Sequence, residues 1–137
     1  MSSQFYDVEQ EKNVLSFALS TLDNCGEAIQ KVRGGHFEDT RHQRIWEAAK
    51  FYYQQYGGVL CDAGLQALLS QNEVPPDKQV MYWTLLQDVR QRVITHDRFK
   101  VSMGILDDLR FKRGLYDMIN SAAAHLERGQ IDSSKVC

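Results

Sequence analysis

The longest run of unbroken helical periodicity, residues 95–128, constrains the fold most. It contains no proline and keeps apolar residues at steps of three, four or seven. At 1.5 Å per residue a helix of this length would extend about 51 Å. A compact chain of 137 residues is only roughly 37 Å across. The segment therefore predicts either a helix that projects beyond the body or one that kinks at Gly104 or Gly114.

The apolar faces of this segment favour projection. One continuous stripe consists of Val101, Ile105, Leu109, Tyr116, Ile119, Ala123 and Leu126. On one flank the N-terminal half adds Phe99, Met103 and Leu106, and on the opposite flank the C-terminal half adds Phe111, Leu115, Met118 and Ala122. A helix that is apolar on more than one side needs more than one packing partner. The alternative is a kinked helix buried at the centre of a monomer.

The rest of the chain is also helical in its periodicity, so the predicted fold class is all-α. We expect one domain over residues 1–137: a compact bundle of about five helices, the head, over about 5–92, followed by the long helix over about 95–128. The expected shorter helices span about 8–22, 25–32 and 41–56, the first capped by Asp7 and the third by Thr40. Two more follow, one capped by Asp62 and one beginning near Pro76. Glycine pairs at 34–35 and 57–58 are expected to end helices.

Composition excludes several classes of protein. With 43% apolar residues, 25% charged residues and a net charge of −2, the chain is that of an ordinary soluble globular protein. It shows no signal peptide and no run of 18 apolar residues, so a cytoplasmic location is expected and no membrane association. Three widely spaced cysteines, Cys25, Cys61 and Cys137, are interpreted as reduced thiols.

No motif announces an active site. His36, Glu38, Asp39 and His42 are residue types that bind metals, but three lie in a predicted loop and His42 in a first helical turn. The glycine pairs belong to no GxxxxGK[ST] phosphate-binding loop. We therefore expect no catalytic, cofactor-binding or metal-binding residues. A small all-α enzyme remains an alternative class, although the sequence indicates no cleft of polar groups.

Local charge gives one further signal. Residues 90–113 hold seven basic and three acidic side chains. The ordinary interpretation is a solvated helix face. The alternative function is a stand-alone nucleic-acid-binding or replication adaptor, whose affinity for DNA would fall steeply with salt.

The order of several short motifs resembles the N-terminal domain of DnaB-type replicative DNA helicases, bacterial or phage. The family's first motifs are an acidic-Glu-x-x-Val-Leu-x-x-x-Leu helix, an Asp-Phe or Glu-Phe turn and a His-x-x-Ile-aromatic-x-Ala helix. These are followed by a Gly before an extended stretch that reaches an Asp, then by a Leu-rich helix, and finally by a basic residue before a Leu-hydrophobic pair. They correspond here to Asp7 to Glu11 with Val14, Leu15 and Leu19, Phe37, His42 to Ala48, Tyr56 to Asp62, Leu65 with Leu68 and Leu69, and Arg110 to Tyr116. The resemblance extends over about residues 5–130, with departures at Val74 to Asp77 and after His125.

The resemblance implies a non-catalytic collar domain that mediates oligomerisation and docks primase, or in some systems a helicase loader, during DNA replication. Its helical hairpins pair into dimers, and three dimers form a collar on a hexameric motor. ATP and Mg²⁺ would be needed only by a motor domain, whose motifs are absent from these residues. Direct DNA binding is expected to be weak or absent.

From the resemblance and the helix faces we expect oligomer or hairpin contacts on the long helix. The candidate residues are Phe99, Met103, Leu106, Arg110, Phe111, Arg113, Leu115 and Met118. If so, Leu106→Asp lowers the mass of the assembly without loss of helicity, whereas global unfolding marks a core residue. Gly129 to Asp132 is interpreted as the turn after the first hairpin helix, so position 137 is expected to be a truncation point.

Overall fold

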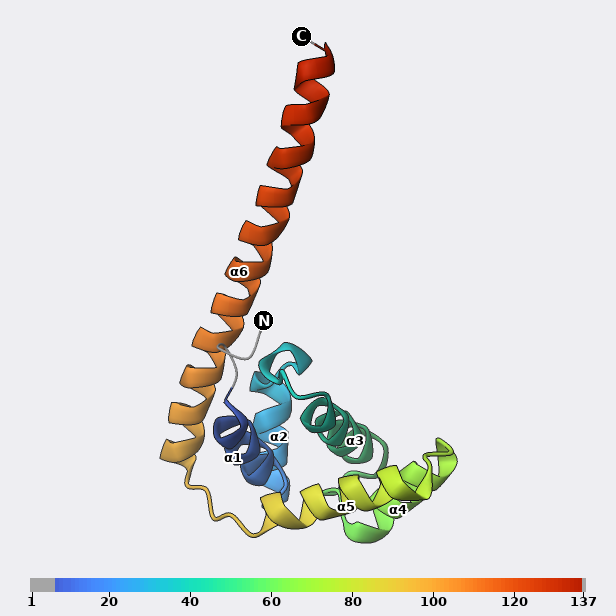
Figure 1. The fold of residues 1–137 in the computed structure, drawn as a ribbon. Coiled ribbons are helices and arrows are strands. Elements are labelled where there is room, and N and C mark those ends of the chain that lie inside the picture. Colours follow the sequence, from blue (N-terminus) through green and yellow to red (C-terminus); the bar gives the residue numbers. More distant parts are fainter. Residues whose placement is uncertain (1–6, 137) are drawn as a thin grey trace.

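The computed structural model describes the backbone of residues 7–136 and the side chains of residues 7–126. Over this range the chain is helical and contains no strand. The helices are α1 (Val8–Ala18), α2 (Leu22–Lys31), a short 3₁₀ helix η2 (Gly34–His36), α3 (Thr40–Tyr56), α4 (Asp62–Gln71), α5 (Pro76–Arg90) and α6 (His96–Val136). The predicted all-α fold, a compact head followed by one long helix, is confirmed (Figure 1).

Side-chain caps determine where most helices begin. Asp7 caps α1 by accepting hydrogen bonds from the backbone N–H groups of Glu9 and Gln10, which satisfies donors that a helix start leaves open. Pro76 occupies the first turn of α5, as expected. Gly57 ends α3 in the left-handed conformation at φ 65°.

Three helix boundaries differ from the predictions. The first helix ends at Ala18 rather than near residue 22. The second begins at Leu22 rather than at 25, because the Thr21 side chain accepts a hydrogen bond from the Asn24 N–H and caps α2. Gly34 and Gly35 do not end α2, which stops at Lys31; they form η2 instead.

Two caps also fall one residue earlier than predicted. Cys61, not Asp62, caps α4, and its Sγ accepts a hydrogen bond from Gly64 N–H. Asp39, not Thr40, caps α3 by accepting from Arg41 N–H. In both places the accepting side chain stands on the last extended residue, as an N-cap requires.

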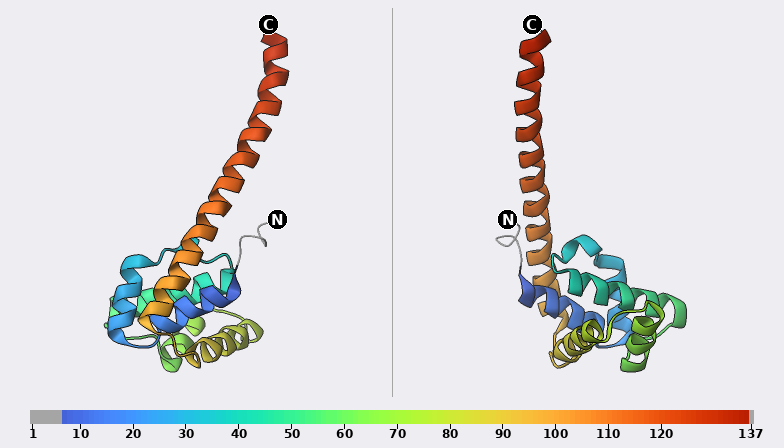
Figure 2. Two further views of the ribbon diagram at one scale, coloured as in Figure 1. Left: turned by 90° about the vertical axis from the view of Figure 1, so that its left-hand side faces the viewer. Right: turned by 45° about the vertical axis from the view of Figure 1, so that its right-hand side comes forward.

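The core of the head forms around α1, which packs against α2, α3, α5 and α6. Its largest fully buried side chains include Phe17, Phe37, Ile45, Trp46 and Leu86. Burial of such side chains contributes about 1.5–3 kcal/mol each. Three turns of α1 therefore hold together helices that are distant in the sequence (Figure 2).

A buried hydrogen bond joins two of the motifs on which the family resemblance rests. Glu11 on α1 and His42 on α3 are both fully buried, with 2.7 Å between Glu11 Oε1 and His42 Nδ1. Glu11 also accepts hydrogen bonds from the backbone N–H groups of Glu38 and Asp39. The opposite ring atom, His42 Nε2, is buried without a hydrogen-bond partner. One carboxylate thus holds the turn between η2 and α3 against α1.

Helix α6 projects far beyond the head (Figures 1 and 2). Projection is the outcome that the apolar residues on both flanks of its stripe favour. Its 41 residues correspond to a length of about 60 Å. The expected end near residue 128 and the expected turn at Gly129 to Asp132 are wrong, because the helix continues through both to Val136. A glycine inside a helix costs only about 1 kcal/mol and no proline follows, so nothing local stops it.

Candidate interaction surfaces

The part of α6 outside the head carries an exposed apolar surface. We call it the arm stripe; it consists of Phe111, Leu115, Met118, Ile119, Ala122 and Leu126. Phe111 is 68% exposed and Met118 62%. The spacing places these side chains on one face of the helix. Among the described residues no other element covers this face, so it is an unpartnered surface.

Three predicted interface residues lie elsewhere. Phe99 and Leu106 are completely buried and Met103 is 8% exposed. They pack in the core of the head, where Phe99 stacks on Phe17 with ring centroids 4.0 Å apart. The prediction that these three residues contact a second subunit or a hairpin mate is therefore corrected. Helix α1 already occupies their flank of α6.

Polar contacts reinforce this packing between α1 and α6. Buried Ser102 donates to Gln10 Oε1 at 2.7 Å and lies 3.3 Å from Asn13 Nδ2. Asn13 in turn accepts from Arg92, which forms an ion pair with Glu9. The packed part of α6 is thus fixed by hydrogen bonds as well as by apolar contacts.

Arg110 and Arg113 contact the head of their own chain. Arg113 Nη2 donates to Gly35 O at 2.7 Å, and its Nε lies 3.2 Å from Glu38 Oε2. A Cβ atom built on Gly35 would lie 3.1 Å from Arg110 Nε, which places the Arg110 side chain directly over this glycine. Their predicted position at the edge of an intermolecular interface is untested, but both arginines touch η2.

The basic stretch 90–113 is largely neutralised within the chain. Four of its seven basic residues form ion pairs, with Asp62, Glu9, Asp108 and Glu38 as the acidic partners. Phosphate binding needs cations that are free to replace counterions. The structure therefore lends little support to the nucleic-acid-binding alternative.

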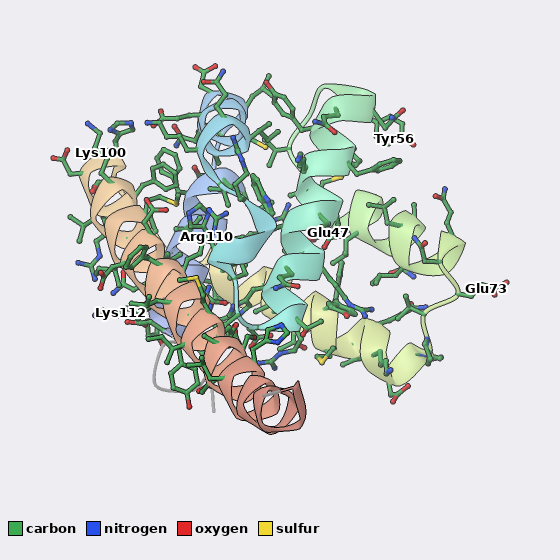
Figure 3. All side chains as sticks on the ribbon, turned by 90° about the horizontal axis from the view of Figure 1, so that it is seen from above. Glu47, Tyr56, Glu73, Lys100, Arg110 and Lys112 are labelled. Carbon is green, nitrogen blue, oxygen red and sulfur yellow. The ribbon has the colours of Figure 1, made fainter. Side chains whose placement is uncertain are left out.

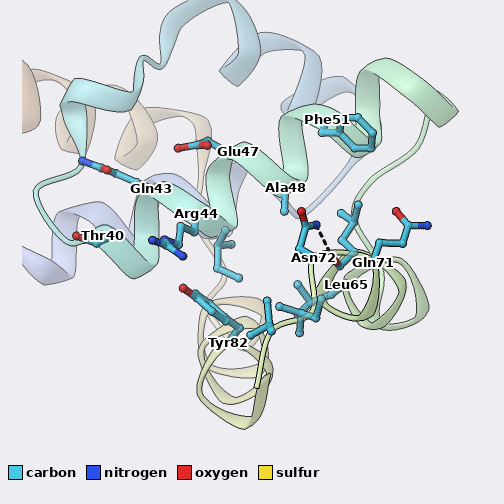
Figure 4. Close-up of a pocket in the computed structure, with 14 residues that line it drawn as sticks. Thr40, Gln43, Arg44, Glu47, Ala48, Phe51, Leu65, Gln71, Asn72 and Tyr82 are labelled. Atoms are coloured by element: carbon cyan, nitrogen blue, oxygen red, sulfur yellow. Dashed lines mark hydrogen bonds between the residues drawn. The ribbon is translucent and has the colours of Figure 1, made fainter. Parts of the chain in front are cut away.

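A groove of about 910 Å³ lies between α3, α4 and α5 (Figure 4). Its lining includes buried Leu65, Leu69 and Tyr82 and the half-exposed ring of Phe51. Polar and charged side chains also line it: Thr40, Gln43, Arg44, Glu47, Gln71 and Asn72. Apolar contacts with polar groups around them are typical of protein interfaces. Sequence reasoning did not find this groove, because it depends on how three helices splay apart.

The cluster with metal-binding residue types is divided among separate contacts. His36 pairs with Asp107, Glu38 with Arg113 and His42 with Glu11, while Asp39 caps α3. No group of three His, Cys, Asp or Glu side chains able to hold a metal occurs among the described residues. Each of these four side chains therefore stabilises a separate contact within the head or between the head and α6.

The two described cysteines differ in environment. Burial raises the pKa of the Cys25 thiol. At Cys61 the Gly64 backbone N–H and then the Tyr52 hydroxyl lower the thiol pKa by hydrogen bonding the thiolate. Both are free thiols. The predicted reduced state agrees with this for these two positions.

Together these features define a small all-helical domain with an amphipathic arm that leaves the head. In the described part, no helix has the length and apolar character needed to cross a bilayer.

Residues 3–59 match the family model of the DnaB-like helicase N terminal domain. The resemblance of this chain to a DnaB-type N-terminal domain is therefore confirmed, and the matched residues include α1, α2, η2 and α3. Comparison with curated proteins and with solved structures gives no match. The match supports the assignment of these residues to the N-terminal domain of a replicative helicase. The correspondence of the motifs beyond residue 59 remains an interpretation.

Proposed function

We propose that this chain is a non-catalytic collar domain of a hexameric replicative helicase, which self-associates through α6. The arm stripe is the observation that carries the proposal. Its five large side chains are 40–68% exposed. They therefore present an apolar surface of roughly 500 Å², if a fully exposed side chain of this size is taken as about 150–250 Å². The largest apolar patch on a typical soluble monomer is about 300–600 Å², and a patch of this size is often functional.

The partner in this proposal is a second copy of the chain, and dimers then assemble three at a time. Two arm stripes packed together would remove about 1,000 Å² from water, near the lower limit for a specific interface. Polar side chains on the opposite face of the arm, such as Asn120, would stay in solvent. The pairing therefore uses one face of the helix only.

The test is the mass of the purified chain by light scattering over a range of concentrations. The wild-type mass should rise with concentration, and Leu115→Asp or Met118→Asp should keep it at that of a monomer with unchanged helicity. Asn120→Asp adds the same charge on the opposite face and should behave as wild type. A wild-type chain that stays monomeric at every concentration would contradict self-association.

We also propose that the groove between α3, α4 and α5 receives a helix of the primase. Arg44 and Glu47 support this, because both are exposed, line the groove and have no ion-pair partner among the described residues. A primase helix with an acidic side chain opposite Arg44 and a basic one opposite Glu47 would complement the groove. In helix-in-groove binding an amphipathic helix lays its apolar face into the groove, and complementary charges around it add specificity.

Titration of the chain with primase from the same replicon tests this docking. Arg44→Glu should weaken binding, whereas Lys50→Glu, on the same helix but outside the groove, should have little effect. Equal affinities for the two variants would place primase elsewhere. A helicase loader that competes with primase for wild type but not for Arg44→Glu would identify the loader as the occupant instead.

A further inference from the structure

The direction in which α6 leaves the head is set by its packing against two elements. Apart from a hydrogen bond between His96 and Glu27 at its start, α6 packs against α1 and η2. In different proteins the crossing angles of packed helix pairs scatter by about 15–20° around the preferred values, so packing of two helices does not by itself define the angle closely. Over the arm beyond Arg113, about 35 Å long, such a variation would move the tip by about 10 Å. Contact with α1 alone would therefore leave the direction of the arm relative to the head less closely defined.

The short helix η2 provides a second, offset support. His36 Nδ1 accepts a hydrogen bond from Arg33 N–H at 2.9 Å, so the ring proton lies on Nε2. That Nε2 donates to Asp107 on α6. The His36 ring is 2% exposed, and the backbone bonds from His36 N–H to Arg33 O and from Phe37 N–H to Gly34 O close the turn. The support is therefore held rigidly by the head.

Three residues of α6 follow one another along this support at steps of three. Asp107 meets His36, Arg110 lies over Gly35, and Arg113 binds Gly35 O and Glu38. Arg110 lies on the side of α6 that faces the head, and Lys112 on the outer side (Figure 3). The Arg113 side chain is only 11% exposed. Hydrogen bonds of this kind, with a charged donor and little solvent, are stronger than ordinary surface pairs.

We propose that Asp107, Arg110 and Arg113 form a brace that fixes the angle between α6 and the head. They are positioning residues, which act on the arm stripe through the direction of the helix. The importance of that angle for assembly rests on the proposed function, since it sets where two heads lie once their arms pair. The angle itself is a property of the single chain.

The test is a distance distribution between spin labels on the head and on the arm. Exposed positions Lys78 on α5 and Ser121 on α6 are suitable, as Lys78→Cys and Ser121→Cys in a chain with Cys61→Ser and Cys137→Ser. A trace of doubly labelled chain in an excess of unlabelled chain reports only the intrachain distance. The result is thus independent of whether the chain self-associates.

Wild type should give one narrow distribution, and Arg113→Ala should give a broader and shifted one with the same helicity. Lys112→Ala is the matched control, because Lys112 pairs with Asp108 within α6. Arg113→Lys should restore part of the wild-type width, since an ammonium can donate to Gly35 O but cannot reproduce both guanidinium contacts.

Asp107→Ala provides a second variant at a largely exposed site, in case Arg113→Ala fails to fold. The proposal is overturned if folded Arg113→Ala or Asp107→Ala keeps the narrow wild-type distribution. It is also overturned if Lys112→Ala broadens the distribution as much as Arg113→Ala does. If the chain is monomeric but its distance distribution still depends on the brace residues, self-association is rejected and the brace is supported.

Discussion

The packed and the free parts of α6 contain the same large apolar residue types in opposite environments. Phe99, Met103 and Leu106 are buried, whereas Phe111, Leu115 and Met118 are exposed. Both sets occur at helical spacing and on a flank of the same helix. What differs is the neighbour: α1 covers the first set, and no described element covers the second. An apolar flank therefore indicates that a partner is needed and leaves open whether the chain itself supplies it.

The largest expected effect is a difference between two leucine truncations. Leu106→Ala should lower the free energy of unfolding of the head by about 2–5 kcal/mol, because it leaves a cavity beside α1. Leu115→Ala should change it by less than about 0.5 kcal/mol, since its site is exposed. Urea denaturation of dilute, monomeric chains measures both. Equal losses would show that the arm folds back onto the head.

Glu11 tests how much the buried polar contacts between α1 and the start of α3 stabilise the head. Glu11→Gln keeps the shape but loses the charge that three donors share, so the head should lose about 1–3 kcal/mol. Glu9→Gln is the matched control: its carboxylate is 66% exposed and should contribute less than about 1 kcal/mol. Similar denaturation midpoints for the two variants would contradict a structural role of the buried pair.

Two glycines allow the same comparison within the backbone of α6. A Cβ atom at Gly104 or at Gly114 would meet nothing within 4 Å, so alanine should favour the helix by about 0.5–1 kcal/mol at either position. Gly104→Ala should stabilise the head against urea, because its helix unfolds with the head. Gly114→Ala should instead slow amide hydrogen exchange in the arm and leave the head's unfolding unchanged. Head stabilisation by both would show that arm and head unfold as one unit.

Much of the fold was predictable because most helix ends are determined by residues close to them in the sequence. Asp7, Gly57 and Pro76 mark the boundaries that the sequence indicates, and the apolar periodicity defines the helices between them. The errors occurred where a less common residue or a distant contact decides the outcome. Cys61 caps α4 although cysteine is not a preferred cap, and no local signal stops α6 before Val136.

The candidate surfaces were only partly predictable. The arm residues Phe111, Leu115 and Met118 are exposed, and their role in an interface stays a prediction. The burial of Phe99, Met103 and Leu106 depends on which flank α1 meets, and periodicity cannot choose between flanks. The steps of three from Asp107 to Arg113 were visible in the sequence, but their partner, η2, lies more than 70 residues earlier in the chain.

The smallest expected effect concerns acid stability and again separates the head from α6. The hydrogen bond from Lys12 Nζ to Asp88 Oδ2, 2.7 Å long, lowers the pKa of Asp88. Ionised Asp88 therefore favours the folded head at pH values above the ordinary pKa of an aspartate. This contribution is lost as the pH falls through the lower, folded-state pKa.

Lys12→Met should make the decline in stability towards acid slightly shallower, within the small range expected for a half-exposed pair. Lys112→Met removes an exposed ion pair within α6 and should leave that decline unchanged. Urea midpoints between pH 3 and pH 7, about the range in which carboxylates titrate, would detect the difference, and identical profiles for the two variants would contradict a contribution from Asp88.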